Sequence, residues 1–200
     1  IIARPVDEEE LVARARTLMR RKRYMDALRQ RLDHSLELAI TDQLTGLYNR
    51  RFLFTQLGPL VQRSQCGGNS VSVMTLDIDH FKRCNDAFGH DVGDAVLQEF
   101  SARLGSNVRP NDFACRMGGE EFVVIMPNPT GDIACHAAER VRRQMCASPF
   151  NVPRAPHPLE ITVSIGVACS EDGEESPDTL LKRADEALYE AKRTGRNRVV

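Results

Sequence analysis

Residues 71–78 read Val-Ser-Val-Met-Thr-Leu-Asp-Ile, and this stretch decides the fold. Its side chains alternate with period two and are rich in β-branched types, which predicts a strand that carries Asp77 near its end. Residues 113–116 and 121–126 predict two further strands, and the glycine pair between them predicts a hairpin. Residues 159–169 alternate again and predict another strand.

Apolar residues at helical spacing separate these strands. The predicted helices run from a cap at Asn49 toward Gln65, over residues 91–104, over residues 133–146, and from Pro177, after a cap at Ser176, to about Arg193. The core order is therefore β-α-β-β-α-β, an α+β fold with a split βαβ (ferredoxin-like) sheet. We expect a mostly antiparallel sheet with helices packed on one face, and a short strand at Val199-Val200.

Residues 1–40 predict a long, strongly charged N-terminal helix. One column of residues recurs every seven positions: Leu11, Leu18, Met25, Leu32 and Ala39. A companion column is half charged, so the coiled-coil seam is incomplete: Ala15, Lys22, Arg29 and Leu36. Two interpretations remain open, because this helix could pair with a second copy or pack on another domain of a longer protein. The chain does not begin with Met, so we expect it to be an excised piece.

Composition excludes several classes of protein. Lys and Arg number 27 against 28 Asp and Glu, so no global positive field exists to bind duplex nucleic acid. No apolar run approaches the length of a membrane segment, which is about 18 residues. The six cysteines include no C-x-x-C pair, and several lie in apolar patterns, which favours reduced thiols and a cytoplasmic protein.

Carboxylates gather where the predicted strands end. Asp77 and Asp79 share a face by alternation, and a strand-end carboxylate can bind a hard cation such as Mg²⁺. Glu120 and Glu121 follow directly after the glycine pair Gly118-Gly119, in a hairpin expected beside the Asp77 strand. This constellation suits metal-assisted phosphoryl chemistry. The alternatives are that the aspartates serve as caps or ion-pair partners and that the hairpin tip is merely solvated.

A polar segment, residues 85–94, is expected to connect the first of these strands to its helix. Asn and Asp side chains can read the edge of a purine, and a carboxylate that accepts from N1–H and N2–H₂ of guanine would discriminate against adenine. The alternative is ordinary loop chemistry, with Asn85 or Asp91 as helix caps and Gly93 for close packing.

These motifs together resemble the GGDEF family of diguanylate cyclases. The resemblance rests on Asp77-x-Asp79-x-Phe81-Lys82-x-x-Asn85-Asp86-x-x-Gly89-His90-x-x-Gly93-Asp94 followed by Gly118-Gly119-Glu120-Glu121-Phe122, and it extends from residues 42–51 to residues 191–197. It implies a nucleotidyl-cyclase palm over residues 41–200. Residues 1–40 resemble the end of a receiver domain (Arg4-Pro5 and an acidic helix start) plus a linker helix. Position 120 holds Glu where the family name has Asp; both residues offer a carboxylate.

The resemblance implies that two GTP molecules are joined into the bacterial second messenger cyclic di-GMP with loss of two pyrophosphates. Each subunit of a homodimer would hold one GTP. Asp77, the carbonyl of Ile78 and Glu120 would hold Mg²⁺ (or Mn²⁺), and Glu120 would assist the attacking 3′-hydroxyl. Glu121 is a second candidate ligand.

The resemblance also implies a set of substrate contacts. Asn85 and Asp94 would read guanine with His90 nearby. Phe81 and Lys82 would contact the phosphates through backbone or side chain, and Lys192 and Arg196 would clamp the terminal phosphates. The alternative for the last pair is a solvent-facing helix end whose cations the helix dipole favours.

A product-binding inhibitory site is implied by Arg109-Pro110-Asn111-Asp112, which matches an R-x-x-D motif. Arg140 and Arg63 are expected to complete this site, since Arg pairs with phosphate or stacks on guanine. The alternative is a helix-end salt bridge. The receiver-like remnant implies two-component control, in which phosphorylation drives dimerisation.

Two other functions stay open. A binding module would hold GTP or cyclic di-GMP and signal without turnover. A different palm-type nucleotidyl cyclase or polymerase would act on ATP, and it would not depend on Asn85 and Asp94 for its choice of base.

Overall fold

The alternating run that begins at Val71 forms strand β2 (Val71–Ile78), and every residue of the strand is buried. The computed structural model describes residues 8–67, 70–129, 131–170 and 176–200. Its five-stranded sheet has the order β1-β3-β4-β2-β5. Strand β2 therefore lies inside the sheet and pairs antiparallel with β4 (Glu121–Pro127) and β5 (Val163–Cys169).

Two strands complete the sheet at the edge away from β5, and one of them belongs to the start of the domain. Strand β3 (Phe113–Gly118) pairs antiparallel with β4, and the two-residue β1 (Tyr48–Asn49) pairs parallel with β3. The sheet is thus mixed but mostly antiparallel, and the predicted α+β class and hairpin are confirmed.

The helices follow the predicted order, with one helix that the sequence analysis did not anticipate. They are α1 (Glu8–Ile40), α2 (Arg50–Gln65), α3 (Phe81–Phe88), α4 (His90–Asn107), α5 (Gly131–Cys146) and α6 (Pro177–Arg193). The predicted caps are confirmed: Asn49 accepts a hydrogen bond from the Phe52 amide, and Ser176 accepts one from the Thr179 amide. Such caps satisfy amides that have no partner inside the helix.

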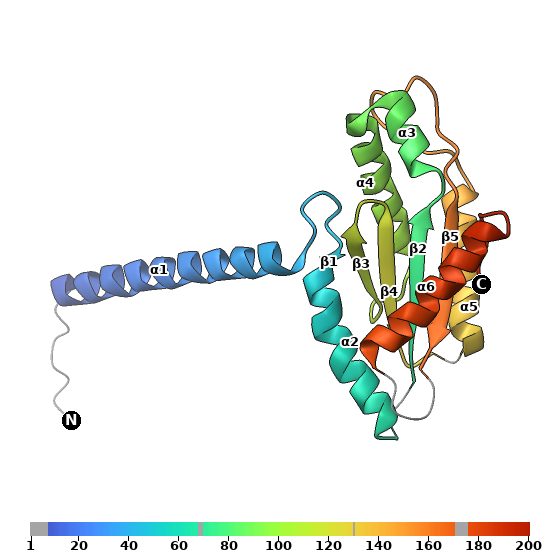
Figure 1. Ribbon diagram of the computed structural model, residues 1–200. Helices are drawn as coiled ribbons and strands as arrows, with labels where there is room; N and C mark the ends of the chain where they lie inside the picture. Colours follow the sequence, from blue (N-terminus) through green and yellow to red (C-terminus); the bar gives the residue numbers. More distant parts are fainter. Residues whose placement is uncertain (1–7, 68–69, 130, 171–175) are drawn as a thin grey trace. The chain divides into compact units, whose positions relative to one another are not determined.

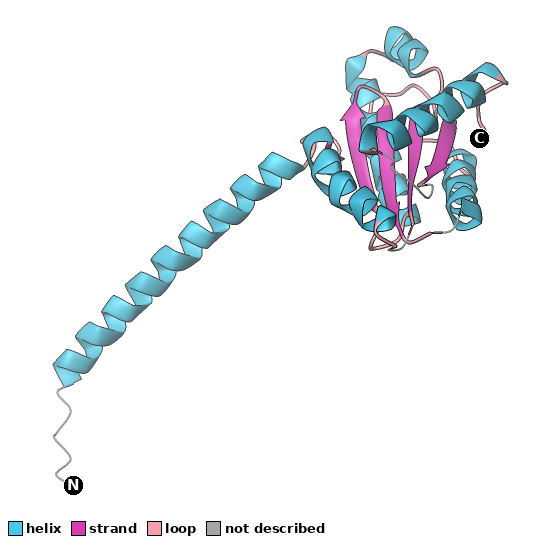
Figure 2. Cartoon of the chain, turned by 60° about the horizontal axis from the view of Figure 1, so that its bottom comes forward, coloured by secondary structure: helices cyan, strands magenta, loops and turns pink. Residues whose placement is uncertain are grey.

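The prediction that helices pack on one face of the sheet is wrong. Helices α4 and α5 share a core cluster with Leu76 of β2 and Phe122 of β4, whereas α2 and α6 share a second cluster with Val73 and Ile125 of the same strands. Figures 1 and 2 show the sheet between these two pairs of helices. Neighbouring residues of a strand face opposite sides, and in β2 both sides are buried and mostly apolar.

Three predicted segments differ in detail. Residues 85–90, expected to connect the first strand to the helix predicted from residue 91, are mostly helical, because they contain the second half of α3 and the first residue of α4. Strand β5 begins at Val163 rather than at residue 159. The expected strand at the C-terminus is an isolated parallel bridge between Ile165 and Val199.

Helix α6 lies unusually close to β5, and this places the end of α6 beside the acidic strand ends. A Cβ atom added at Gly166 would come within 2.1 Å of the Ala184 carbonyl oxygen and 2.2 Å of the Leu188 nitrogen. Only glycine therefore permits this approach of backbone to backbone.

The chain divides into two units, Ile1–Ala39 and Ile40–Val200. The described part of the first unit is helical, and two members of its heptad column, Leu18 and Met25, are 65% and 54% exposed. The residues expected to resemble a receiver domain, Arg4-Pro5, lie outside the described residues. Within the described ranges, no helix has the length and apolar character that crossing a bilayer requires.

Candidate active site

The hairpin between β3 and β4 brings two glycines and two glutamates to one end of the sheet. Gly118 and Gly119 have φ angles of 141° and 54°, which L side chains rarely adopt, and the register shifts between Arg116 and Gly118. The bulge ends the regular pairing just before Glu120. The glycine pair therefore makes a tight bend that leaves backbone open to a ligand.

An arginine that the sequence analysis did not single out holds this bend. Nε and Nη2 of Arg116 donate to the Gly119 carbonyl at 3.1 and 2.8 Å, and Nη1 donates to Oδ1 of Asp42 at 3.1 Å. Partial burial opposes ionisation of Asp42, but hydrogen bonds from Thr45 and Arg116 outweigh it and hold the pKa of Asp42 below its usual value. The start of the domain is thereby tied to the glycine bend.

The carboxylates predicted to share a site lie together. Asp77 stands opposite Glu121 in the register of β2 and β4, and the amide of Ile78 donates to the Glu120 carbonyl at 3.4 Å. Asp77 is only 6% exposed, so its charge needs compensation. Part of that compensation is Lys192 of α6, whose Nζ lies 2.7 Å from Oδ2 of Asp77.

The electrostatics of the cluster disfavour negative charge. Burial raises the pKa of Asp77, the charges of Glu121 and Asp79 raise it further, and Lys192 opposes the rise. Burial, Asp77 and Glu121 likewise raise the pKa of Glu120, again against Lys192. One lysine does not neutralise this group of acids, so a bound cation would be favoured here.

The donor set fits a magnesium ion completed by substrate. Among the described residues, no three His, Cys, Asp or Glu side chains are arranged to hold a metal ion. Mg²⁺ is usually bound by one or two carboxylates together with substrate phosphates rather than by a cage made only of protein. The carboxylates of Asp77 and Glu120 and the carbonyl of Ile78 offer the hard oxygen ligands that such an ion requires.

The residues predicted to read a base lie on two consecutive helices. Asn85 belongs to α3, while His90 and Asp94 lie one turn apart at the start of α4 and are exposed. Oδ1 of Asn85 is buried without a hydrogen-bond partner. A Cβ atom at Gly93 would come within 1.8 Å of this oxygen, so the glycine makes room for the amide. An unpaired buried acceptor is costly, which fits a position that a ligand completes.

The start of α3 limits how the predicted residues can contact a phosphate. The side chain of Phe81 is 4% exposed and belongs to the core, so only its backbone is available to a phosphate. Lys82 is exposed, as predicted for a phosphate contact. His80 precedes the helix in a left-handed conformation and makes no side-chain cap. The first amides of a helix have no partner inside it and favour anions.

The predicted inhibitory residues are brought together in part. Oδ2 of Asp112 accepts a hydrogen bond from the Arg109 amide at 2.9 Å, which closes the turn between α4 and β3. Nη2 of Arg140 on α5 donates to the Asn107 carbonyl at 2.9 Å, next to this turn. Arg63 is exposed in the last turn of α2, which covers the other face of the sheet.

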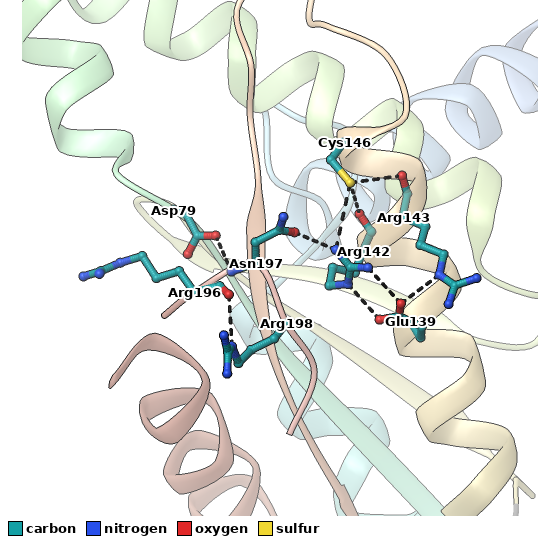
Figure 3. Close-up of polar contacts among 8 residues, drawn as sticks. All are labelled: Asp79, Glu139, Arg142, Arg143, Cys146, Arg196, Asn197 and Arg198. Carbon is teal, nitrogen blue, oxygen red and sulfur yellow. Dashed lines mark hydrogen bonds and ion pairs between the residues drawn. The ribbon is translucent and has the colours of Figure 1, made fainter. Parts of the chain in front are cut away.

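Besides its electrostatic effect on Asp77, Asp79 has structural partners of its own. Its carboxylate accepts hydrogen bonds from Thr162 Oγ1, Ser164 Oγ and the Asn197 amide, at 2.6, 2.7 and 3.0 Å. Asn197 follows Arg196, the second predicted phosphate clamp (Figure 3). Asp79 thus anchors the turn after α6.

The fold and this arrangement of acids define a class of protein. The chain belongs to the GGDEF family, because residues 39–198 match the family model described as "Diguanylate cyclase, GGDEF domain". This confirms the resemblance drawn from the motifs.

Particular relatives agree with that class. The chain is 55% identical over 200 residues to Response regulator PleD of Caulobacter vibrioides. The matched region is 100% of this chain and 44% of that protein. The chain therefore spans less than half the length of this curated relative.

Solved structures show the same fold. The crystal structure of the coiled coil and GGDEF domain of DgcB from Caulobacter crescentus in complex with c-di-GMP has 35% sequence identity and a TM-score of 0.84, and covers 95% of this chain and 98% of that one. The active GGEEF domain of a diguanylate cyclase from Vibrio cholerae has 35% identity and a TM-score of 0.69, over 78% and 96% of the two chains. Residues 118–122 of this chain have the same Gly-Gly-Glu-Glu-Phe sequence.

Proposed function

We propose that this protein is a diguanylate cyclase that condenses two GTP molecules into cyclic di-GMP and two pyrophosphates. The observation that carries the proposal is the buried carboxylate of Asp77 beside Glu120 and Glu121 at the glycine bend, with Lys192 as a neighbouring cation. Membership of the family and the names of the similar structures support it.

The acid cluster would hold the metal ion that binds the reacting phosphate. Asp77, the Ile78 carbonyl and Glu120 would bind Mg²⁺, or Mn²⁺, which neutralises charge on the triphosphate and activates the α-phosphorus. Glu120 would also accept the proton of the attacking 3′-hydroxyl, because a carboxylate positioned at the reacting group can act as a general base. Glu121, opposite Asp77, would add negative charge that strengthens binding of the cation.

The remaining predicted residues would orient the nucleotide. Asn85 and Asp94 would bind the guanine edge near His90, while the α3 backbone at Phe81 and the side chain of Lys82 would contact phosphate. Lys192 and Arg196 would hold the terminal phosphates that leave as pyrophosphate. Each 3′-oxygen forms a bond to the α-phosphorus of the other nucleotide as a pyrophosphate leaves.

The proposed site holds one GTP, whereas the reaction joins two. The reaction therefore requires a homodimer in which each subunit presents one GTP. Holding both nucleotides in register replaces a slow encounter by an intramolecular step. Helix α1 would supply this pairing as the linker helix of a longer protein, whose phosphorylated receiver domain would promote it.

Product would inhibit the enzyme at the turn formed by Arg109 and Asp112. Arg140 lies next to this turn, and its guanidinium suits a phosphate or a guanine face. Arg63, from across the sheet, would reach the same ligand from a second copy of the domain.

The direct test is incubation of the purified protein with GTP and Mg²⁺ and detection of cyclic di-GMP by chromatography and mass spectrometry. Glu120→Gln should lower the rate at least about 100-fold, because it removes a ligand and the proton acceptor together. GTP binding without any turnover by the wild type would instead favour the binding module.

A matched control separates this chemistry from a general loss of charge. Glu186→Gln removes an exposed carboxylate of α6 that pairs with Lys182 at 3.8 Å, and it should retain wild-type activity. Full activity of Glu120→Gln would refute the assigned role. Equal use of ATP and GTP would favour the alternative nucleotidyl cyclase or polymerase.

A further inference from the structure

The turn after α6 has a backbone that needs support. Gly195, Arg196 and Asn197 all have positive φ angles, of 124°, 62° and 45°. The left-handed conformation costs a residue with a side chain roughly 1 kcal/mol or more, and here two such residues adopt it in succession. Contacts from the rest of the domain must therefore stabilise this turn.

The first support comes from Asp79, the residue that follows β2. Oδ2 of Asp79 accepts the Asn197 amide at 3.0 Å, and the same carboxylate is fixed by the hydroxyls of Thr162 and Ser164. Asp79 is 7% exposed, so its position is set by packing as well as by these hydrogen bonds. The backbone of the turn is thus anchored to a rigid strand end.

The second support comes from α5, on the other side of the turn. Nη1 of Arg142 donates to the side-chain oxygen of Asn197 at 2.8 Å. Glu139 fixes Arg142 from the same helix through two hydrogen bonds of 2.7 and 2.8 Å. These hydrogen bonds from Arg142, joined by one from Arg143, lower the pKa of Glu139 to about 2, so the carboxylate stays ionised at physiological pH.

Arg196 precedes Asn197, the residue that both supports contact. Its carbonyl accepts a hydrogen bond from Arg198, and its amide donates to the Ala191 carbonyl of α6. Figure 3 shows its side chain directed away from Arg142 and Glu139, on the side of the network where Asp79 lies. The backbone of Arg196 is therefore held while its guanidinium remains available.

We propose that Asp79 and Arg142 are positioning residues, which hold the turn Gly195–Asn197 so that Arg196 meets the terminal phosphates of the bound nucleotide. This inference rests on the proposed function, in which Arg196 binds those phosphates. A guanidinium that is already oriented loses less conformational freedom on binding than one carried by a loose loop.

The test compares Arg142→Met with wild type for binding of a non-hydrolysable GTP analogue in the presence of Mg²⁺. Methionine retains an apolar stem but removes the bond to Asn197, so affinity should fall about fivefold, the value of one such hydrogen bond. Asn197→Gly should give the same loss, because glycine keeps the left-handed backbone and removes only the side-chain amide. In turnover assays, the loss should appear mainly in KM for GTP.

The matched control is Arg143→Met. Arg143 also binds Glu139 from α5, at 2.8 Å, but its described hydrogen bonds do not include Asn197. This variant should bind the analogue as tightly as wild type. Thermal melting of each variant reports whether the fold is retained.

A double-mutant cycle separates positioning from a general structural effect. If Arg142 acts through Arg196, then adding Arg142→Met to Arg196→Met should cause no further loss of affinity. A loss that persists in the Arg196→Met background, or wild-type affinity of Arg142→Met, would overturn the proposal. Failure of the proposed function is distinguishable, because wild-type protein would then form no cyclic di-GMP.

Discussion

Asp77 is a buried carboxylate on which opposing electrostatic effects act. Burial raises the pKa of this carboxylate most, Glu121 and Asp79 raise it further, and the ion pair with Lys192 opposes the rise. An acid whose pKa is raised on folding binds protons more tightly in the folded state than in the unfolded state. The cluster that serves the proposed chemistry therefore destabilises the metal-free domain at neutral pH, as is common at functional sites.

The residue-scale prediction concerns Glu120, whose pKa is raised by burial and by Asp77 and Glu121. Stability from such a group is present below its unfolded pKa and is lost as the pH rises through its folded pKa. Glu120→Gln removes this loss, so the unfolding free energy of the variant relative to wild type should rise between pH 4 and pH 8. Denaturant unfolding in chelator at both pH values measures the gain.

Glu186→Gln serves again as the control, since Glu186 is exposed on α6. Its stability relative to wild type should not improve as the pH rises. A gain for Glu120→Gln that is the same at pH 4 and pH 8 would contradict the electrostatic explanation.

At the scale of elements, the junction of α3 and α4 makes the proposed guanine site. Gly89, with a φ angle of 84°, ends one helix and begins the next. The two helices then pack so closely that Gly93 faces Asn85 and Phe81. Because the Asn85 oxygen has no partner, its position is set by this packing rather than by hydrogen bonding.

Gly93→Ala should therefore damage binding more than folding. The added methyl group would displace the Asn85 amide, and GTP-analogue affinity should fall about tenfold through loss of a base contact. Alanine also has a higher helix propensity than glycine, which offsets part of the steric cost to stability. Calorimetric titration and thermal melting measure the two effects.

Gly105→Ala is the matched control on the same helix, because a Cβ atom there meets nothing within 4 Å. It should leave affinity unchanged and stabilise the domain by about 0.5–1 kcal/mol. Unchanged affinity of Gly93→Ala would argue against Asn85 as a contact to the base.

At the scale of the whole molecule, the sheet is covered on both faces, and each face contributes differently to the proposed function. Helix α6, with α2, covers one face and carries Lys192 to Asp77. Helices α4 and α5 cover the other face and carry Asp94 and Arg140. The residues proposed to bind substrate and those proposed to bind inhibitor are thus held by one sheet.

The proposed dimerisation through α1 can be tested at the scale of the whole molecule. Leu18 and Met25 are exposed and lie seven residues apart on this helix. The double variant Leu18→Lys/Met25→Lys should dissociate at concentrations where wild type is dimeric, because like charges would face each other at the seam. Sedimentation and the dependence of specific activity on protein concentration report the change, with about a tenfold shift expected from loss of roughly 1.4 kcal/mol of apolar contact.

Arg20→Gln, on α1 but outside the heptad columns, is the control and should leave assembly unchanged. Affinity for the GTP analogue should be the same in all three proteins. Wild-type assembly of the double variant would exclude this seam as the dimer contact.

The spacing of residues along the sequence was sufficient to predict most helices and strands and part of the candidate site. The alternation at residues 71–78, the caps Asn49 and Ser176, and the glycine bend each depend on near neighbours, so the sequence predicted them correctly. The proximity of Asp77 to Glu120 also followed, because adjacent strands in a split βαβ order leave little choice of partner.

Contacts between distant segments were decided by the tertiary structure. Arg116 bonds to Asp42 across 74 residues, and Arg142 bonds to Asn197 across 55, and neither pair has a local signature. The covering of both faces of the sheet was missed because a fully apolar strand and a half-exposed strand can share the same β-branched pattern. Sequence spacing is a property of neighbours along the chain, whereas these pairings depend on which surfaces meet when α2, α5 and α6 pack on the sheet.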